Sequence, residues 1–427
     1  MNLLIRNGLV VAPAEKEEGT LDILIEGGKI AKIAKNIKAS AGKIIDATGK
    51  VVMPGIVDMH VHLRQPGRED KETVASATRA ALKGGVTSVL AMPNTEPAID
   101  SGQNVKLLKN IIKADANCNV FISGAISKGR LGKELTDIGL MKKEGAVAIT
   151  DDGSSVESQE LLLAAFKKAK VQGITVICHC EDKALSNGGV VNLGIISTRL
   201  GLRGISKESE YKRIERDIQL ARKAGAAIHI AHVSCKESVE LIAQAKKKGI
   251  RVTAETAPHY FSLTENDCLG YDTNMKMNPP LRTSEDVKAL KDGLKRGIID
   301  VIASDHAPHT ENEKDIEFDR AEFGVIGLET ELAVSITELV KPGVLGWKAL
   351  VEKLSLNPAQ ILGLNKGTLA AGRDADIVII DPDREWSLRK DDIVSQSKNS
   401  PFIGRKLNGL VEYTIYNGKI VYNGIYR

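Results

Sequence analysis

The chain has 427 residues, of which 42% are hydrophobic and 27% charged, and its formal net charge is +4. This length exceeds one average domain, and the composition is that of an ordinary soluble protein. Because lysines and acidic residues are interspersed, we expect no nucleic-acid-binding and no membrane-binding surface. The sequence shows no bilayer-spanning apolar stretch and no signal peptide, and its five scattered cysteines are typical of reduced thiols in a cytoplasmic protein.

Residues 1–53 predict short strands joined by tight turns. Asn7-Gly8 separates two apolar segments, and Gly27-Gly28 separates two more. Both pairs are typical of two-residue hairpin turns. The four predicted strands are Leu3–Arg6, Leu9–Val11, Asp22–Glu26 and Lys29–Ile33.

Residues 54–365 alternate short apolar strands with helix-length segments. Such alternation predicts a parallel sheet, and eight repeats over about 300 residues fit a (β/α)8 TIM barrel. An open, doubly wound sheet is the alternative, but we find no glycine-rich dinucleotide or P-loop motif that supports it. The predicted barrel strands are 56–62, 86–92, 119–126, 146–150, 175–179, 227–232, 251–255 and 301–305.

Residues 366–427 return to the strand pattern of the N-terminus, and Asn417-Gly418 is a third hairpin pair. The predicted strands are 375–380, 411–416 and 419–422. Neither end of the chain has enough strands to bury a core alone. We therefore expect residues 1–53 and 366–427 to form one small composite β-sandwich domain beside an α/β barrel domain of residues 54–365.

His60-Val61-His62 closes the first predicted barrel strand. Because side chains alternate along a strand, His60 and His62 point to one face and can chelate a metal ion there. Active sites of (β/α)8 barrels lie at the C-terminal ends of the strands. Four other predicted strands end in a histidine or an aspartate, at Asp151-Asp152, His179, His232 and Asp305.

A rim of this kind can hold two metal ions through a shared carboxylate. Nitrogen and oxygen ligands favour zinc, with manganese, cobalt or iron as alternatives. Two bridged metals make hydroxide available near neutral pH and polarise a carbonyl. A neighbouring carboxylate can then carry a proton to a leaving nitrogen. The pattern predicts hydrolysis of an amide-like C–N bond, or its reversal.

Six segments contain most of these polar residues: Asp58–Gly67, Ala91–Thr95, Thr150–Gly153, Glu255–Tyr260, Lys276–Pro280 and Ser304–His309. Together they resemble the cyclic amidohydrolases of the amidohydrolase superfamily, and most specifically the class I dihydroorotases. The resemblance runs over essentially the whole chain. Any single motif is shared with hydantoinases or allantoinases, so the resemblance to dihydroorotases rests on the combination of all six.

The resemblance implies a zinc centre with two ions per subunit. The implied ligands are His60, His62 and Asp305 for one ion, His179 and His232 for the other, and Asp152 as the bridge. The spacing to the downstream motifs favours Asp152 over Asp151 as the bridge, but both residues stay candidates for that position. Many relatives place a carboxylated lysine there, and its absence is expected to weaken one ion. Asp305 would also be the catalytic base.

Substrate recognition follows partly from charge. Arg64, two residues past His62, can hold a carboxylate through two hydrogen bonds. Asn94 and Asn278 can supply amide hydrogen bonds, and His309 can donate to the same carboxylate. The resemblance assigns Arg64, Asn94, Asn278 and His309 to the substrate.

Three polar neighbours of the expected ligands are predicted to play supporting parts. His229 lies three residues before His232, so its side chain should point to the other face of the strand. His306 follows Asp305 and should likewise point away from the metal ions. Asp58 shares the face of His60 and is expected either to support that ligand or to be a buried, hydrogen-bonded carboxylate.

The predicted activity is the reversible cyclisation of N-carbamoyl-L-aspartate to L-dihydroorotate in pyrimidine (UMP) biosynthesis. An allantoinase or a hydantoinase is the alternative within the same class of enzyme. A non-catalytic homologue that supports aspartate transcarbamoylase is the alternative from another class, and the presence of every implied ligand disfavours it. The resemblance implies a homodimer, and a complex with aspartate transcarbamoylase stays open.

Overall fold

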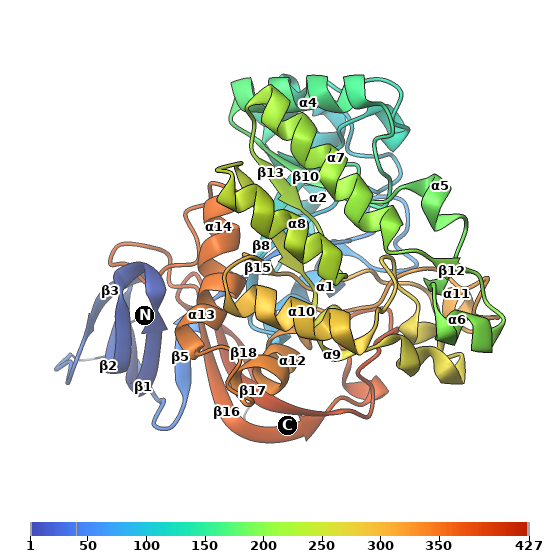
Figure 1. Cartoon of the computed structure of the whole chain (residues 1–427). Coiled ribbons are helices and arrows are strands. Elements are labelled where there is room, and N and C mark those ends of the chain that lie inside the picture. Colours follow the sequence, from blue (N-terminus) through green and yellow to red (C-terminus); the bar gives the residue numbers. More distant parts are fainter. Residues whose placement is uncertain (1, 40, 425–427) are drawn as a thin grey trace.

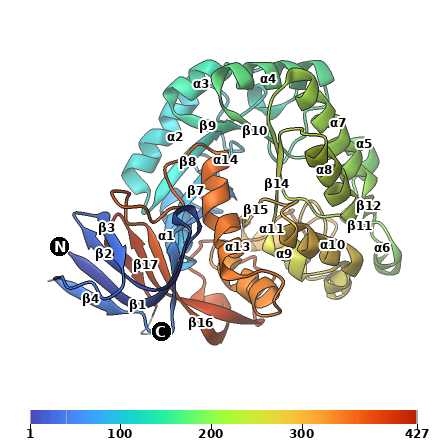
Figure 2. The ribbon, with the colours of Figure 1, turned by 60° about the vertical axis from the view of Figure 1, so that its left-hand side comes forward.

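The computed structural model of the protein describes residues 2–39 and 41–424. It contains a barrel ringed by helices and a β-sheet unit built from both ends of the chain (Figure 1). Turning the molecule shows α2, α3, α4, α7 and α8 in an arc around the outside of the barrel (Figure 2). Within the described residues, we find no helix whose length and apolar character would let it traverse a bilayer.

Eight parallel strands form the barrel in sequence order, and each overlaps one of the predicted segments. The predicted fold class is therefore confirmed. The strands are β6 (Ile56–Val61), β7 (Val86–Ala91), β8 (Asn119–Gly124), β9 (Ala146–Ile149), β10 (Thr175–Cys178), β13 (Ile228–Ile230), β14 (Val252–Thr256) and β15 (Val301–Ile302).

The barrel closes between its first and last strands at the C-terminal rim. Val61 on β6 forms a parallel bridge with His306, which follows β15. The backbone N–H of His62 donates to the carbonyl of His306 over 2.9 Å. A main-chain hydrogen bond across this seam therefore brings His62 next to Asp305.

Helices connect the strands, and several begin at a polar residue whose side chain accepts a backbone N–H. Thr73, Ser101, Ser158 and Thr283 each cap a helix in this way. The helices are α1 (Val74–Lys83), α2 (Gly102–Asp115), α3 (Ile138–Glu144), α4 (Gln159–Gln172), α5 (Lys183–Ser186), α6 (Ile195–Leu200), α7 (Glu208–Ala224), α8 (Lys236–Lys247), α9 (Pro258–Ser262), α10 (Ser284–Lys295), α11 (Glu311–Lys314), α12 (Glu331–Ser335), α13 (Trp347–Val351) and α14 (Asn357–Ile361).

The second unit is an eight-stranded sheet in which the two ends of the chain meet. Its path is β18-β17-β16-β5-β1-β2-β3, with β4 also on β1. Ile5, Ile23, Ile377 and Ile415 pack in one buried cluster, so both ends share a core. The strands are β1 (Leu3–Ala12), β2 (Glu17–Glu26), β3 (Lys29–Ala34), β4 (Lys43–Asp46), β5 (Val51–Pro54), β16 (Ile377–Ser387), β17 (Lys406–Tyr416) and β18 (Lys419–Asn423).

The predicted hairpin at Asn7-Gly8 is wrong. Residues 3–12 form the single strand β1, and the pairing of β1 with β2 shifts register between Ile5 and Gly8. Asn7 adopts a φ of 60°, and its backbone N–H donates to the Asp22 carboxylate. Asn7 and Gly8 therefore form a β-bulge instead of a turn. A left-handed residue is compatible with both structures, and pairing with β2 decides between them.

Residues 393–400, the strap, lie between β16 and β17 and cross back to the rim of the barrel. Ser397 Oγ donates to the carbonyl of Lys71 over 2.7 Å. Asn399 Nδ2 donates to the carbonyls of Ala307 and Gly324, both over 3.1 Å. The strap thus ties the loop after β6 to the loop after β15.

Candidate active site

The six predicted metal ligands converge at the C-terminal rim of the barrel. Five are buried, and Asp305 exposes 12% of its side chain. Because parallel strands end at the same rim, residues far apart in sequence meet there. The ligands are His60 and His62 at the end of β6, Asp152 after β9, His179 after β10, His232 after β13 and Asp305 after β15.

His60, His62 and Asp305 form the first cluster. The Nε2 atoms of both histidines lie 3.5 Å from Asp305 Oδ1. Three ligand atoms of these residues lie within 4.8 Å of one another. Two imidazole nitrogens and one carboxylate oxygen are a donor set suited to zinc and related transition metals.

Asp152 lies between this cluster and the other two histidines. Its Oδ2 is 3.4 Å from His62 Nε2, and its Oδ1 is 3.3 Å from His60 Nε2. The same Oδ1 lies 3.7 Å from His179 Nδ1 and 3.5 Å from His232 Nε2. One carboxylate therefore contacts all four histidines, which is the position that a bridge between two ions requires.

His179 and His232 point ring nitrogens at each other. His179 Nδ1 lies 2.7 Å from His232 Nε2, and the rings meet edge to face. A neutral imidazole has one acceptor nitrogen, so both atoms can offer a lone pair only if each ring is protonated on its other nitrogen. Both atoms also face Asp152, so they can serve as ligands of one ion.

Unpartnered polar atoms at this centre fit a bound cation. Among the described residues, His60 Nε2 and Asp152 Oδ1 are buried and have no hydrogen-bond partner. Burying polar atoms without a partner is costly, and a cation bound between them removes that cost. The residues present therefore fit a divalent metal ion.

Glu255 at the end of β14 holds His60 from behind. Its Oε1 lies 2.5 Å from His60 Nδ1, and its Oε2 lies 3.1 Å from His229 Nε2. His229 Nδ1 in turn lies 2.8 Å from Thr253 Oγ1. Since the carboxylate can only accept, His60 carries a proton on Nδ1, and Nε2, which faces the centre, is the nitrogen that could bind a metal ion.

Burial and charge act in opposite directions on the groups of this centre. Burial alone would lower the pKa of His60, but Asp152, Asp305 and Glu255 around it raise that pKa well above 6.5. Burial alone would raise the pKa of Asp152 and of Asp305, yet His60 and the other facing histidines lower both. Both carboxylates are therefore ionised at neutral pH.

Asp151 faces away from the histidines. Its Oδ1 accepts from the backbone N–H groups of Ile126, over 2.8 Å, and Ser127, over 3.1 Å. Its other oxygen accepts from the Ser127 hydroxyl. Asp151 therefore fixes the loop after β8, and Asp152 is the residue that points into the centre.

The other polar neighbours also pack behind the ligands. His306 Nδ1 accepts from the Gly327 N–H over 3.2 Å, and its Nε2 lies 3.5 Å from Glu72 Oε2. Asp58 Oδ1 accepts from the N–H groups of His60, over 3.1 Å, and Ser304, over 3.2 Å. Both side chains hold the backbone around the ligands.

The four residues expected to bind substrate surround the same rim. Arg64 Nη2 lies 3.2 Å from His309 Nε2, and Arg64 Nε donates to the Pro308 carbonyl over 3.1 Å. Asn94 Oδ1 lies 2.8 Å from His62 Nδ1. Asn278 Nδ2 donates to Glu181 Oε2 over 3.2 Å. The structure thus brings all ten predicted residues together.

Three of these residues adopt left-handed backbone conformations that non-glycine residues rarely use. The φ angles are 61° at Arg64, 34° at His232 and 49° at Asp305. Strain of this kind persists where the surroundings enforce it, and it concentrates at functional sites. The left-handed conformation changes the direction of each side chain where the regular strand ends.

Sequence reasoning assigned no role to Glu181, Glu255 and Lys71. Glu181 Oε2 lies 3.3 Å from His179 Nε2, and Lys71 Nζ lies 3.1 Å from His309 Nδ1. The strand ends could have pointed to both carboxylates, because Glu255 lies at the end of β14 and Glu181 follows β10 by three residues. Lys71 gives no such signal, since it lies in a loop rich in charged residues.

Two family models match the chain. The family described as "Dihydro-orotase-like" matches residues 49–238, and the family described as "Amidohydrolase family" matches residues 337–422. Together they cover parts of the barrel and of the C-terminal strands.

Curated relatives match nearly the whole chain. A dihydroorotase of Elusimicrobium minutum is 54% identical over 98% of this chain and 97% of the relative. A dihydroorotase of Geotalea daltonii is 50% identical over 99% of both chains. Among solved structures, an L-hydantoinase (dihydropyrimidinase) from Arthrobacter aurescens superposes with a TM-score of 0.90 at 29% identity, covering 99% of this chain and 96% of that one.

Proposed function

The chain belongs to the dihydroorotase family of amidohydrolases, and from that premise we propose a specific division of labour among its residues. The activity is that of a hydrolase acting on cyclic amides, in which N-carbamoyl-L-aspartate and L-dihydroorotate interconvert. The observation that supports the proposal best is the position of Asp152. It lies within 4 Å of four histidines and beside the Asp305 cluster.

The metal proposed for this centre is zinc, with two ions per subunit. His60, His62 and Asp305 would hold one ion, His179 and His232 the other, and Asp152 would contact both. A bound zinc ion supplies hydroxide near neutral pH and polarises the carbonyl under attack. Because Asp152 stands where many relatives have a carboxylated lysine, we expect the two ions to differ in affinity.

Asp305 is the proposed proton carrier. Its side chain reaches solvent, and its pKa lies below the ordinary value because the facing histidines outweigh burial. It therefore starts as a carboxylate that can accept the proton of the attacking water. In ring opening it passes this proton to the leaving ring nitrogen, and in ring closure it receives the amide proton.

The substrate carboxylate is proposed to bind at Arg64 and His309. The guanidinium lies beside the imidazole at the mouth of the centre and is partly buried, so an anion there gains a strong charge-assisted hydrogen bond. Asn94 and Asn278, on loops that flank the centre, would orient the ring amides. L-Dihydroorotate has a carboxylate and hydantoins lack this group, so the pocket favours the first substrate.

We also propose the organisation of the whole protein. Residues 1–53 with 366–427 would form one domain, and residues 54–365 the other. The shared core of β1, β2, β16 and β17 supports this division. From the family resemblance we expect a cytoplasmic homodimer, with an aspartate transcarbamoylase complex as a further assembly to test by co-purification.

The decisive experiment is hydrolysis of L-dihydroorotate by metal-depleted protein, with and without added zinc. Asp305→Ala should abolish zinc-dependent turnover while the protein remains folded. Asp292→Ala, at an exposed position on α10, is the matched control and should behave like the unaltered chain. Turnover of allantoin or hydantoin without turnover of dihydroorotate would overturn the assignment.

A further inference from the structure

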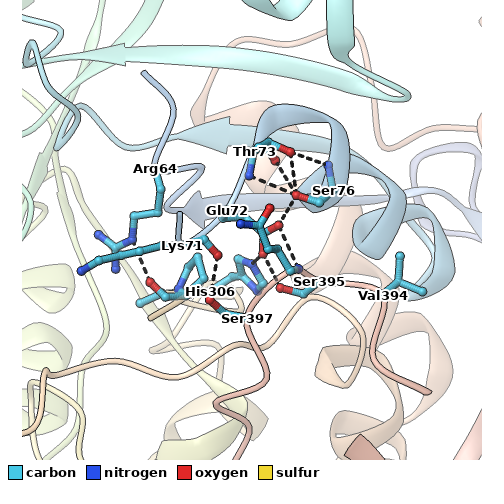
Figure 3. Close-up of polar contacts among 12 residues, drawn as sticks. Arg64, Lys71, Glu72, Thr73, Ser76, His306, Val394, Ser395 and Ser397 are labelled. Atoms are coloured by element: carbon cyan, nitrogen blue, oxygen red, sulfur yellow. Dashed lines mark hydrogen bonds and ion pairs between the residues drawn. The ribbon is translucent and has the colours of Figure 1, made fainter. Parts of the chain in front are cut away.

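Lys71 is a buried lysine in the loop between β6 and α1, with only 5% of its surface exposed. Its side chain lies close to Arg64, while the neighbouring Glu72 points the other way, toward Ser76 and Ser395 (Figure 3). A buried lysine is expensive unless its ammonium group has specific partners. The partners of the Lys71 ammonium group therefore indicate the role of this residue.

The ammonium group of Lys71 lies between an imidazole and a carboxylate. Lys71 Nζ is 3.1 Å from His309 Nδ1 and 2.9 Å from Glu313 Oε1. An ammonium group has three donors and no acceptor, so His309 Nδ1 must offer its lone pair. The proton of His309 then has to be on Nε2.

The opposite side of the ring agrees with this assignment. His309 Nε2 lies 2.9 Å from the Phe323 carbonyl oxygen, which can only accept a hydrogen bond. Arg64 Nη2 lies 3.2 Å from the same nitrogen, but a guanidinium can only donate, so it does not accept this hydrogen. Arg64 and His309 Nε2 then offer two donors side by side, as an anion requires. Burial, Arg64 and Lys71 also lower the pKa of His309, which keeps the ring neutral.

Without Lys71, Glu313 would compete for the same ring. Glu313 Oε2 lies 3.5 Å from His309 Nδ1. A carboxylate at that position favours a proton on Nδ1, either by turning the neutral ring into its other tautomer or by charging it. Lys71 is the group that separates this carboxylate from the imidazole.

The main chain of Lys71 is held in place by the strap. Its carbonyl accepts from Ser397 Oγ over 2.7 Å (Figure 3). The adjacent Glu72 carboxylate accepts from the Gln396 N–H over 3.1 Å. Glu72 also accepts from the hydroxyls of Ser76 and Ser395. These contacts fix the start of the lysine side chain and leave its end to reach His309.

We propose that Lys71 is a positioning residue that holds His309 as the neutral Nε2–H tautomer, whose hydrogen the substrate carboxylate would share with the Phe323 carbonyl. The inference rests on the proposed function only in the identity of that carboxylate. Arg64 and Lys71 are balanced in part by Glu313, so these three groups leave one positive charge for one carboxylate. Arg68 pairs with both Asp70 and Glu313, each at 2.8 Å, and because Arg68 and Asp70 carry opposite charges they do not change that sum.

The first test reads the tautomer directly in the metal-loaded, ligand-free protein. Nitrogen-15 NMR of histidine-labelled protein distinguishes protonated from unprotonated ring nitrogens, and His309→Gln identifies the signals. We expect a protonated Nε2 and a bare Nδ1 in the unaltered chain and in Lys71→Arg, and a protonated Nδ1 in Lys71→Met. A protonated Nδ1 in the unaltered chain overturns the proposal even if Lys71→Met does not fold.

The second test separates positioning from support of the loop. Lys71→Met should raise KM for L-dihydroorotate about tenfold and change kcat less than about threefold, because the lost contact is to a part of the substrate that does not react. Lys71→Arg should recover most of the loss. Lys353→Met, which removes another buried lysine that donates to the Ile299 carbonyl, should leave KM unchanged.

The two proposals fail differently. If the unaltered chain does not hydrolyse dihydroorotate, the proposed function is wrong, but the NMR measurement still decides the tautomer. If dihydroorotate is hydrolysed and Lys71→Met has the same KM and the same His309 signals as the unaltered chain, Lys71 merely anchors Glu313.

Discussion

Asn94 Oδ1 lies 2.8 Å from His62 Nδ1, while His62 Nε2 faces the carboxylates of Asp152 and Asp305. The amide oxygen can only accept, so it fixes the proton on Nδ1 and aims the Nε2 lone pair at the metal centre. A residue expected to bind substrate therefore also orients a metal ligand.

Asn94→Ala should weaken zinc binding as well as substrate binding. Loss of the partner that orients a metal-binding histidine typically lowers metal affinity about 10- to 100-fold. Competition with a chromogenic chelator measures this affinity without any substrate. An unchanged zinc affinity with a raised KM would limit Asn94 to substrate binding.

Glu255→Gln should lower zinc affinity by a similar factor of about 10 to 100. Burial opposes ionisation, but His60 and His229 hold the pKa of Glu255 at about 2, so a charged partner is lost at neutral pH. The matched variant is Glu285→Gln, an exposed carboxylate paired with Lys236, which should leave zinc affinity unchanged. The contrary result would be full zinc affinity in Glu255→Gln.

Asp151 and Asp152 should respond in opposite ways to the same substitution. Asp152→Asn removes the carboxylate that contacts four histidines, so bound zinc measured by atomic absorption should fall and turnover should be lost. Asp151→Asn should retain zinc but lower the free energy of unfolding by about 1–3 kcal/mol, because it weakens buried hydrogen bonds to the loop after β8. Retention of both ions in Asp152→Asn would argue against a bridging role.

Glu331 on α12 is fully buried, and both of its carboxylate oxygens have no hydrogen-bond partner among the described residues. Burial, helped by the charges of Asp58 and Glu255, raises its pKa well above 4.5. The folded chain then binds this proton more tightly than the unfolded chain, so stability is greatest below the unfolded pKa and falls as pH rises.

Glu331→Gln should therefore stabilise the protein at neutral and alkaline pH. The gain should grow by about 1.4 kcal/mol per pH unit between the unfolded and the folded pKa. Denaturant midpoints of both chains between pH 5 and pH 8 measure it. A constant difference across that range would show that Glu331 ionises normally in the folded state.

The sequence by itself determined the barrel and its rim. The eight barrel strands are largely apolar runs separated by helix-length segments. Such runs can be recognised in a sequence because both faces of a strand in a parallel sheet are buried, so nearly every residue must be apolar. His60 and His62 are readable as a pair because strand parity is a local property. For the same reason the hairpins at Gly27-Gly28 and Asn417-Gly418 form as predicted.

Only the tertiary structure decided what depends on partners far away in the chain. Asn7-Gly8 is a bulge because residues 17–26 pair across it, and Asp152 rather than Asp151 faces the histidines because the loop after β8 occupies Asp151. Lys71 meets His309 only after the barrel closes at Val61 and His306. Local patterns specify strands and faces, whereas these contacts arise from the closure and packing of the whole chain.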